Sequence, residues 1–279
     1  MFLKNVVVFV DPSPAGEART RYAVKLCLRH GARLIGIFVA PSGWQGNPAD
    51  SYARGHDAIR ELIERHRAEE LAASDAASRS FAALTAPDDI SFEFRIIRDD
   101  ATEHAKLHSL HADLVIVGHP RPGGLPEQWS ADGLLLATGV PVLIVPDRWT
   151  GETIAERILL GWNASREARR AITDSLPLLA AAQSVAVVVV DPARNERHGE
   201  EPGADVALYL SRHGATVTVV QIQSDGLPVA DVILEHALQH QIDLIVVGAY
   251  SHARSREAIF GGVTRSLLKK ATIPILIAH

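Results

Sequence analysis

Residues 242–268, IDLIVVGAYSHARSREAIFGGVTRSLL, combine the residue types that could bind a phosphate group. A β-branched run ends at Gly248, which lets the chain turn sharply and allows close approach of a ligand. Gly261 and Gly262 come directly before a segment with helical spacing, where free backbone N–H groups and the helix dipole favour an anion. Thr264 could add a hydroxyl donor. The alternative is that the two glycines only serve the turn from loop to helix.

The corresponding loop of the first half, GHPRPGGLPEQWSADGLL from residue 118 to 135, lacks this pattern. Its prolines restrict the backbone and remove N–H donors that a phosphate would need. Glu127 and Asp132 add negative charge. We therefore expect no nucleotide to bind in this loop.

Both loops belong to an internal repeat that organises the whole chain. Three pairs of segments recur in the same order: HADLVIVG (111–118) with QIDLIVVG (241–248), TGVPVLIVP (138–146) with ATIPILIAH (271–279), and VVVFVDPSPAGEA (6–18) with RILLGWNASREA (157–168). A period near half the chain predicts two copies of one domain. We expect the first domain at 1–147 and the second at 155–279, joined by a polar linker.

Each copy alternates strand and helix patterns. The first copy predicts strands at 6–10, 33–39, 91–97, 113–117 and 141–145, and helices at 16–30, 56–84 and 101–110. The second predicts strands near 157–161, 185–190, 215–222, 243–247 and 274–278. Alternation of helices with β-branched strands predicts parallel sheets with helices on both faces. The fold class is therefore α/β, with two tandem, doubly wound, five-stranded parallel sheets. Ligands of such sheets bind beyond the carboxyl ends of the strands, where the strand order reverses.

The composition is typical of a globular protein, with 47% hydrophobic and 22% charged residues. A net charge of −5 and a pI near 6.2 argue against nucleic acid and anionic membranes as partners. The apolar run in MFLKNVVVFVDPS is too short for a signal peptide, and no run is long enough to span a membrane. The one cysteine, Cys27, lies in an apolar stripe and is expected to be a buried packing thiol. We expect a cytoplasmic protein.

Several familiar motifs are absent from the sequence. It contains no Walker loop, no GxGxxG after the first strand, and no HEXXH, CxxC or GxSxG. The pairs His104/His108 and His236/His240 have the i,i+4 spacing of metal ligands, but no third ligand accompanies them, so ordinary surface or packed histidines are the favoured interpretation. The segment RELIERHRAEE, residues 60–70, is expected to be a solvated helix face, with docking of a partner as the alternative.

Taken together, the two halves resemble the universal stress proteins in their tandem form, with two domains on one chain. Nucleotide-binding members of that family carry G-x2-G-x9-G-[ST] after the fourth strand and an aspartate after the first. In the second half Gly248 matches the first glycine and Gly261 the third. Ser251 replaces the second glycine, Gly262 replaces the Ser/Thr, and Asn163 replaces the aspartate.

The resemblance implies a nucleotide site mainly in the second domain. Its residues would be Gly161, Trp162, Asn163, Val190, Val247, Gly248, Ser251, Gly261, Gly262, Val263 and Thr264. A weaker site in the first domain would use Asp11, Val39 and Gly118. Arg121 and Ala131 stand there where the later glycines belong.

The resemblance also implies a Rossmann-like fold of the adenine-nucleotide alpha-hydrolase type, with the two domains packed as a pseudo-dimer through their fifth strands. The expected function is stress-response regulation by binding ATP or another adenine nucleotide, with or without Mg2+. No positioned base or nucleophile is visible, so the chain would be at most a weak ATPase. The alternatives are a scaffold that binds another small molecule or a protein partner, and a nucleotidyl-transferring enzyme, for which no motif is present. Further pairing as a homodimer is left open.

Overall fold

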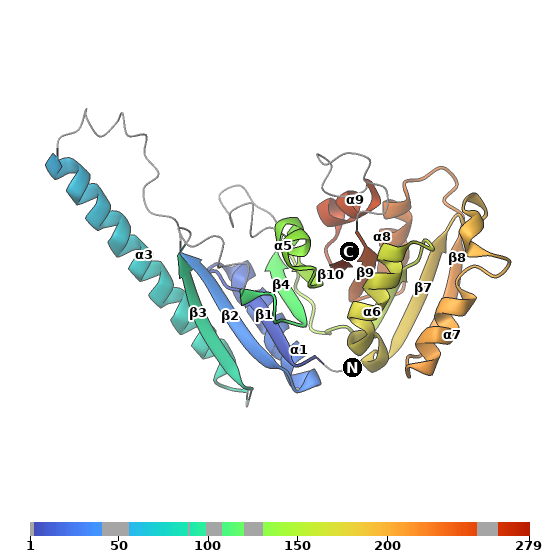
Figure 1. The fold of residues 1–279 in the computed structure, drawn as a ribbon, viewed down its shortest axis with the longest axis horizontal. Coiled ribbons are helices and arrows are strands. Elements are labelled where there is room, and N and C mark those ends of the chain that lie inside the picture. The colour runs from blue at the N-terminus through green and yellow to red at the C-terminus, as the bar shows by residue number, and fades with distance from the viewer. Residues whose placement is uncertain (1–2, 41–55, 89, 99–107, 120–130, 250–261) are drawn as a thin grey trace.

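The chain folds into two α/β halves that lie side by side (Figure 1). The computed structural model describes residues 3–40, 56–88, 90–98, 108–119, 131–249 and 262–279. The first half contains β1 (Asn5–Phe9), α1 (Pro14–His30), β2 (Arg33–Ala40), α3 (His56–Thr85), β3 (Phe92–Arg98), β4 (Leu114–Gly118), α5 (Ala131–Thr138) and β5 (Val142–Val145). The second contains β6 (Arg157–Gly161), α6 (Arg166–Ala181), β7 (Ser184–Val190), two short 3-10 turns, η4 (Pro192–Arg194) and η5 (Glu196–His198), then α7 (Ala204–Arg212), β8 (Val217–Ile222), α8 (Val229–Gln239), β9 (Leu244–Gly248), α9 (Gly262–Lys270) and β10 (Ile275–Ala278).

The two five-stranded parallel sheets join into one ten-stranded sheet. Its order is β3-β2-β1-β4-β5-β10-β9-β6-β7-β8. β5 and β10 pair antiparallel at the centre, with Ile275 opposite Ile144 and Leu276 opposite Leu143. This pairing confirms the contact between fifth strands that the family resemblance implied. It also protects two strand edges that would otherwise be free to pair with other chains.

Apolar residues cover both faces of this sheet, as expected for strands in a parallel α/β fold. On one face the core is shared by α1, α3, α6 and α7, for example through Phe81 and Leu210. On the other face it is shared by α5, α8 and α9, for example through Leu134, Ile233 and Leu267. Cys27 is fully buried in the first of these layers, and burial raises the pKa of its thiol to about 12. This agrees with the prediction of a packing thiol.

The aspartate in each copy of the repeated strand motif has a structural role. At the start of β1, two backbone N–H groups donate to Oδ2 of Asp113 at 2.7 and 2.9 Å. At the start of β6, two backbone N–H groups donate to the two oxygens of Asp243, both at 3.0 Å. Each carboxylate therefore fastens the fourth strand of its half to the first. The repeat made these residues visible in the sequence, but their role was not predicted.

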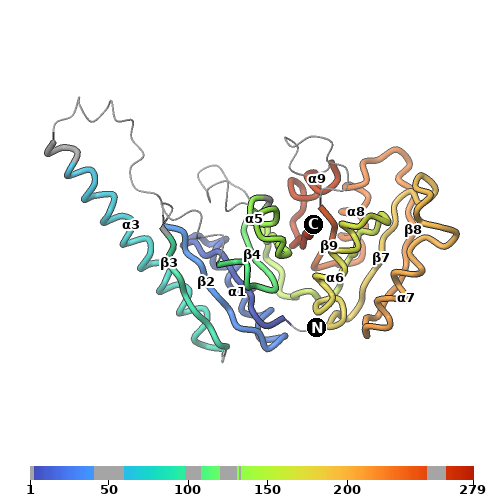
Figure 2. The backbone as a smooth tube through the Cα atoms, in the orientation of Figure 1, coloured from blue at the N-terminus to red at the C-terminus, as the bar shows by residue number. Residues whose placement is uncertain are grey.

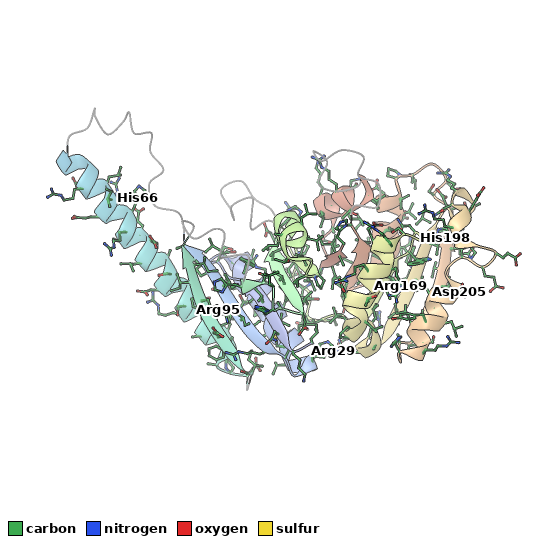
Figure 3. All side chains as sticks on the ribbon, in the orientation of Figure 1. Arg29, His66, Arg95, Arg169, His198 and Asp205 are labelled. Carbon is green, nitrogen blue, oxygen red and sulfur yellow. The ribbon has the colours of Figure 1, made fainter. Side chains whose placement is uncertain are left out.

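The linker between the halves packs against α1. The ring of Trp149 lies edge-on to that of Tyr22, with 5.1 Å between the centroids. Arg29 donates to the carbonyl of Ile154 at 2.6 Å and to that of Ala181 in the second half. Figure 3 shows Arg29 where the two halves meet. The C-terminal end of α1 thus holds the linker and the second half together.

Of the helices expected at 56–84 and 101–110, the structure contains the first. The long helix at 56–84 is present as α3, and its early part extends beyond the neighbouring strands (Figure 2). Most side chains described between 60 and 70 are exposed, as expected for a solvated face. The helix expected at 101–110 is wrong at its described end, because residues 108–110 are not α-helical, and residues 101–107 lie outside the described part.

Candidate functional site

We call the point between β6 and β9, where the strand order of the second half reverses, the second switch point. β9 ends there at Gly248, and the Thr264 hydroxyl of α9 donates to the Gly248 carbonyl at 3.3 Å. Thr264 is buried, so this hydrogen bond places the first turn of α9 against the end of the strand.

The start of α9 is open. Gly262 is its first residue and is exposed, and among the described residues no atom beyond its chain neighbours and its own helix backbone lies within 4 Å of the position that a Cβ would take there. The first turn of α9 contains no acidic residue. An exposed helix start without nearby carboxylates of its own is electrostatically suited to an anion.

Gly248 lies in close contact with the start of α6. A Cβ at this position would overlap with the backbone nitrogen of Ala168 and would lie 2.7 Å from the carbonyl oxygen of Glu167. The absence of a side chain therefore lets the start of α6 pack directly on the end of β9. The sequence predicted a sharp turn and close approach of a ligand, whereas the structure shows close approach of a helix.

Gly161 and Val247 also meet at the second switch point. A Cβ on Gly161 would lie 3.0 Å from Cγ1 of Val247. Trp162, the next residue, is half-buried against the core, and its backbone N–H continues the sheet by donating to Val188 at 2.9 Å. Gly161, Val247, Gly248 and Thr264 thus lie together at the second switch point.

Asn163 lies in the loop after β6 and is tied to the neighbouring loop. Its side-chain oxygen accepts from the backbone N–H of Ser165 at 3.3 Å. Its backbone carbonyl accepts from the side chain of Asn195 at 3.0 Å. Ser165 in turn caps α6 by accepting from the N–H of Ala168 at 3.1 Å. Asn163 therefore helps to shape the loop in which the family resemblance places an aspartate.

The residue after Val190 was not predicted to be important. Asp191 is buried and adopts a left-handed backbone conformation with φ of 50°. Its carboxylate accepts from the backbone and hydroxyl of Ser224 at 2.8 and 2.6 Å and pairs with Arg194 at 2.9 Å. These hydrogen bonds from Ser224 and the charge of Arg194 hold the pKa of Asp191 below its ordinary value. Asp191 fixes the path of the chain as it leaves the Val190 end of β7.

The equivalent point of the first half, between β1 and β4, is called the first switch point below. Asp11 follows β1, and its carboxylate pairs with the guanidinium of Arg19 and accepts from the backbone N–H of Ser13 at 3.0 Å. Arg19 is almost completely buried, with 3% of its side chain exposed, and also donates to the carbonyl of Phe9 at 2.8 Å. Burial would raise the pKa of Asp11, but the charge of Arg19 and the hydrogen bonds of Ser13 and Arg19 outweigh it, so the pKa lies below its ordinary value.

Arg19 was missed because nothing in its local sequence distinguishes it from a surface arginine of α1. Its burial follows from the contact between α1 and the end of β4. A Cβ on Gly118 would overlap with Nη1 of Arg19, so Gly118 provides room for the guanidinium.

The remaining predicted site residues lie in both halves of the chain. Val39 lies near the end of β2, opposite Ile97, and Val263 is exposed on α9. Ala131 is buried at the start of α5. The predictions for Ser251, Gly261 and Arg121 fall outside the described residues.

The histidines and helices of the described residues show neither a metal site nor a membrane span. The rings of His236 and His240 stack with their centroids 4.2 Å apart, and His104 is outside the described residues. In the described residues, no group of three or more histidine, cysteine or acidic side chains is placed to hold a metal ion. None of the described helices combines the length and the apolar character needed to cross a membrane.

A tandem pair of doubly wound α/β domains, each with its switch point at the carboxyl ends of the first and fourth strands, defines a Rossmann-like class of protein. The model of the universal stress protein family matches residues 3–146 and 155–279. This chain therefore belongs to the universal stress protein family, as the sequence resemblance indicated.

Individual relatives agree with this assignment. A universal stress protein from Archaeoglobus fulgidus DSM 4304 is similar in structure, with a TM-score of 0.68 and 15% identity, covering 98% of this chain and 97% of that one. A putative universal stress protein from Pseudomonas aeruginosa UCBPP-PA14 gives a TM-score of 0.55 with 13% identity, covering 99% and 93%. The stress response protein NhaX of Bacillus subtilis (strain 168) is 32% identical over 87 residues. That match spans 31% of this chain and about half, 51%, of the relative.

Proposed function

We propose that this chain is a stress-response regulatory protein that binds ATP or a related adenine nucleotide at the second switch point. The phosphates would lie at the start of α9, near Gly262. The base and ribose would lie along Gly161, Trp162 and Val190. The role is non-enzymatic, with hydrolysis at most slow, and Mg2+ would accompany the nucleotide only through its phosphates.

The observation that supports this proposal is the geometry of α9. Its first residue is an exposed glycine that no described side chain crowds, and the Thr264–Gly248 hydrogen bond holds this helix start at the carboxyl end of β9. Backbone N–H groups at a helix start bind phosphate without a basic side chain. Replacement of the family's Ser/Thr by Gly262 leaves these N–H groups in place.

Calorimetric titration with millimolar ATP, ADP or AMP, each with Mg2+, tests the proposal. We expect saturable binding of ATP to the wild-type chain. A chain that releases no heat and shows no thermal shift with any of the three would refute the proposal. It would favour the scaffold interpretation, in which the loops bind another small molecule or a protein partner.

Gly262→Glu tests the position of the phosphates. Since a Cβ at Gly262 meets no neighbour in the described part of the chain and its φ is not positive, the fold should accept the change, and an acidic residue suits a helix start. A carboxylate about 4 Å from a phosphate costs about 4 kcal/mol at an effective dielectric constant of about 20. Allowing for screening by salt, we expect the Kd for ATP to rise at least about tenfold.

Two controls separate charge and position. Gly262→Gln adds similar bulk without charge and should weaken ATP binding less than Gly262→Glu. Leu238→Glu places the same charge on α8, where the leucine is 82% exposed, and should leave the Kd unchanged. Equal weakening by Gly262→Glu and Leu238→Glu would place the nucleotide elsewhere.

A further inference from the structure

The two halves differ in what occupies their switch points. Ser13 and Ser165 are the N-caps of the equivalent helices α1 and α6. Six residues beyond each cap lie Arg19 in the first half and Ala171 in the second. At equivalent positions of the repeat, the first half therefore has a buried guanidinium and the second half has a methyl group.

Arg19 contacts both strands that form the first switch point. Its Nε donates to the carbonyl of Phe9, the last residue of β1, at 2.8 Å, and its Nη2 pairs with Asp11. Its Nη1 lies against Gly118, the last residue of β4, so closely that a Cβ there would overlap with it. The guanidinium therefore lies between the carboxyl ends of β1 and β4, where an open α/β sheet accepts its ligand.

This arrangement also engages Asp11. The resemblance gives an aspartate after the first strand the task of contacting adenine or ribose. In this chain the carboxylate of Asp11 is already bound by Arg19 and by the backbone and hydroxyl of Ser13. A nucleotide would have to displace a buried charge from its partner, which leaves that charge uncompensated and is costly.

We propose that Arg19 closes the first switch point, so that the chain binds one nucleotide and not two. The guanidinium takes the place of a ligand there, and the first half contributes no nucleotide site. The identity of the ligand as a nucleotide rests on the proposed function. The occupation of the first switch point by Arg19 can be tested without any ligand.

The first test is exchange of the Arg19 Nε–H with solvent, measured by NMR on the full chain and assigned by loss of the signal in Arg19→Ala. Arg212, which is exposed in the last turn of α7, is the comparator. Since hydrogen bonds of charged groups must break before exchange, we expect Arg19 to exchange about tenfold to a hundredfold more slowly. The rate should not change at saturating Mg-ATP. Exchange as fast as that of Arg212, or a rate altered by Mg-ATP, overturns the proposal.

The second test is the binding stoichiometry of Mg-ATP by equilibrium dialysis. We expect one equivalent for the wild type, and little occupancy of Gly262→Glu at Mg-ATP concentrations near the wild-type Kd, because its Kd is at least about tenfold higher. Adding Arg19→Ala to Gly262→Glu recreates the alanine of the second half and should restore saturable binding. Because the single change leaves Asp11 without its partner, the double change Arg19→Met with Asp11→Asn, also combined with Gly262→Glu, removes the pair without leaving a lone charge.

The outcomes separate the two proposals. Two equivalents in the wild type, or binding by Gly262→Glu with the wild-type Kd, would show an accessible first switch point and overturn the role of Arg19. No binding in either Arg19 combination, when the wild type binds one equivalent, would also overturn it. If the wild type binds no nucleotide at all, the proposed function fails, and the exchange rate of the Arg19 Nε–H alone decides whether Arg19 closes the first switch point.

Discussion

The packing of α6 on Gly248 predicts a sharp effect of adding one methyl group. In Gly248→Ala the new Cβ would lie 2.7 Å from the Glu167 carbonyl oxygen, whereas ordinary contact begins at 3.4 Å. The start of α6 must therefore withdraw by more than about 0.7 Å, because the nitrogen of Ala168 and the carbonyl carbon of Glu167 lie closer still to the new Cβ. Because the obstacles are backbone atoms, no rotation of a side chain can relieve the overlap.

The expected cost follows from these contacts. Overpacking of this kind costs about 1–3 kcal/mol. Withdrawal of α6 would also strain its cap, the hydrogen bond of Ser165 to Ala168, which is worth about 1 kcal/mol. Replacing a strand glycine by alanine returns about 0.5–1 kcal/mol. We expect Gly248→Ala to lower the free energy of unfolding by about 1–3 kcal/mol.

Urea unfolding followed by circular dichroism measures this change, with Gly262→Ala as the matched control. A Cβ at Gly262 meets no atom of another described segment within 4 Å, so the alanine there should leave stability unchanged or raise it by up to about 1 kcal/mol. If Gly248→Ala cost less than about 0.5 kcal/mol, the close packing of α6 against β9 would not be the reason for this glycine.

Two further predictions concern the first half. Arg29→Ala removes the cation that binds the carbonyls of Ile154 and Ala181. Limited proteolysis of the linker, followed by mass spectrometry, should therefore proceed about tenfold faster than in the wild type. An unchanged rate of cleavage would contradict this role of Arg29. The pKa of Asp11 is lowered in the fold, because the charge of Arg19 and the hydrogen bonds to the carboxylate outweigh the effect of burial. The ionised carboxylate of Asp11 therefore stabilises the fold at neutral pH. This stabilisation is lost as the pH falls below about 4 and through the folded-state pKa. The difference in urea midpoint between wild type and Asp11→Asn should accordingly shrink between about pH 6 and pH 3, and a constant difference would contradict the assignment.

Much of this fold could be predicted from local sequence. Runs such as VVVF and LIVV are β-branched and bounded by glycine or polar residues, so the strands and their alternation with helices were identified nearly to the residue. The repeat then predicted two copies, and the family resemblance supplied the antiparallel pairing of β5 with β10. These features depend on short-range patterns or on whole-chain similarity.

The site was harder to predict, because its contacts join distant parts of the chain. Gly248, at the end of β9, has the sequence context of a ligand-binding glycine, yet its neighbour is the backbone of Glu167 in α6. Arg19 is one of several arginines in the first half, and only the position of Gly118 explains its burial. Asp191 follows a strand like many aspartates, and its importance depends on Ser224 at the end of the next strand.

The asymmetry of the switch points suggests how the halves divide their roles. α9, whose start is the proposed phosphate site, is held at its other end by the first half, because the ring of His119 contacts the carbonyl of Leu268. The strand that follows α9, β10, pairs with β5 of the first half. In the first half, the Arg19–Asp11 pair lies at the first switch point, where we propose that it takes the place of a ligand. The first half can thus position α9 whether or not the second half holds a nucleotide.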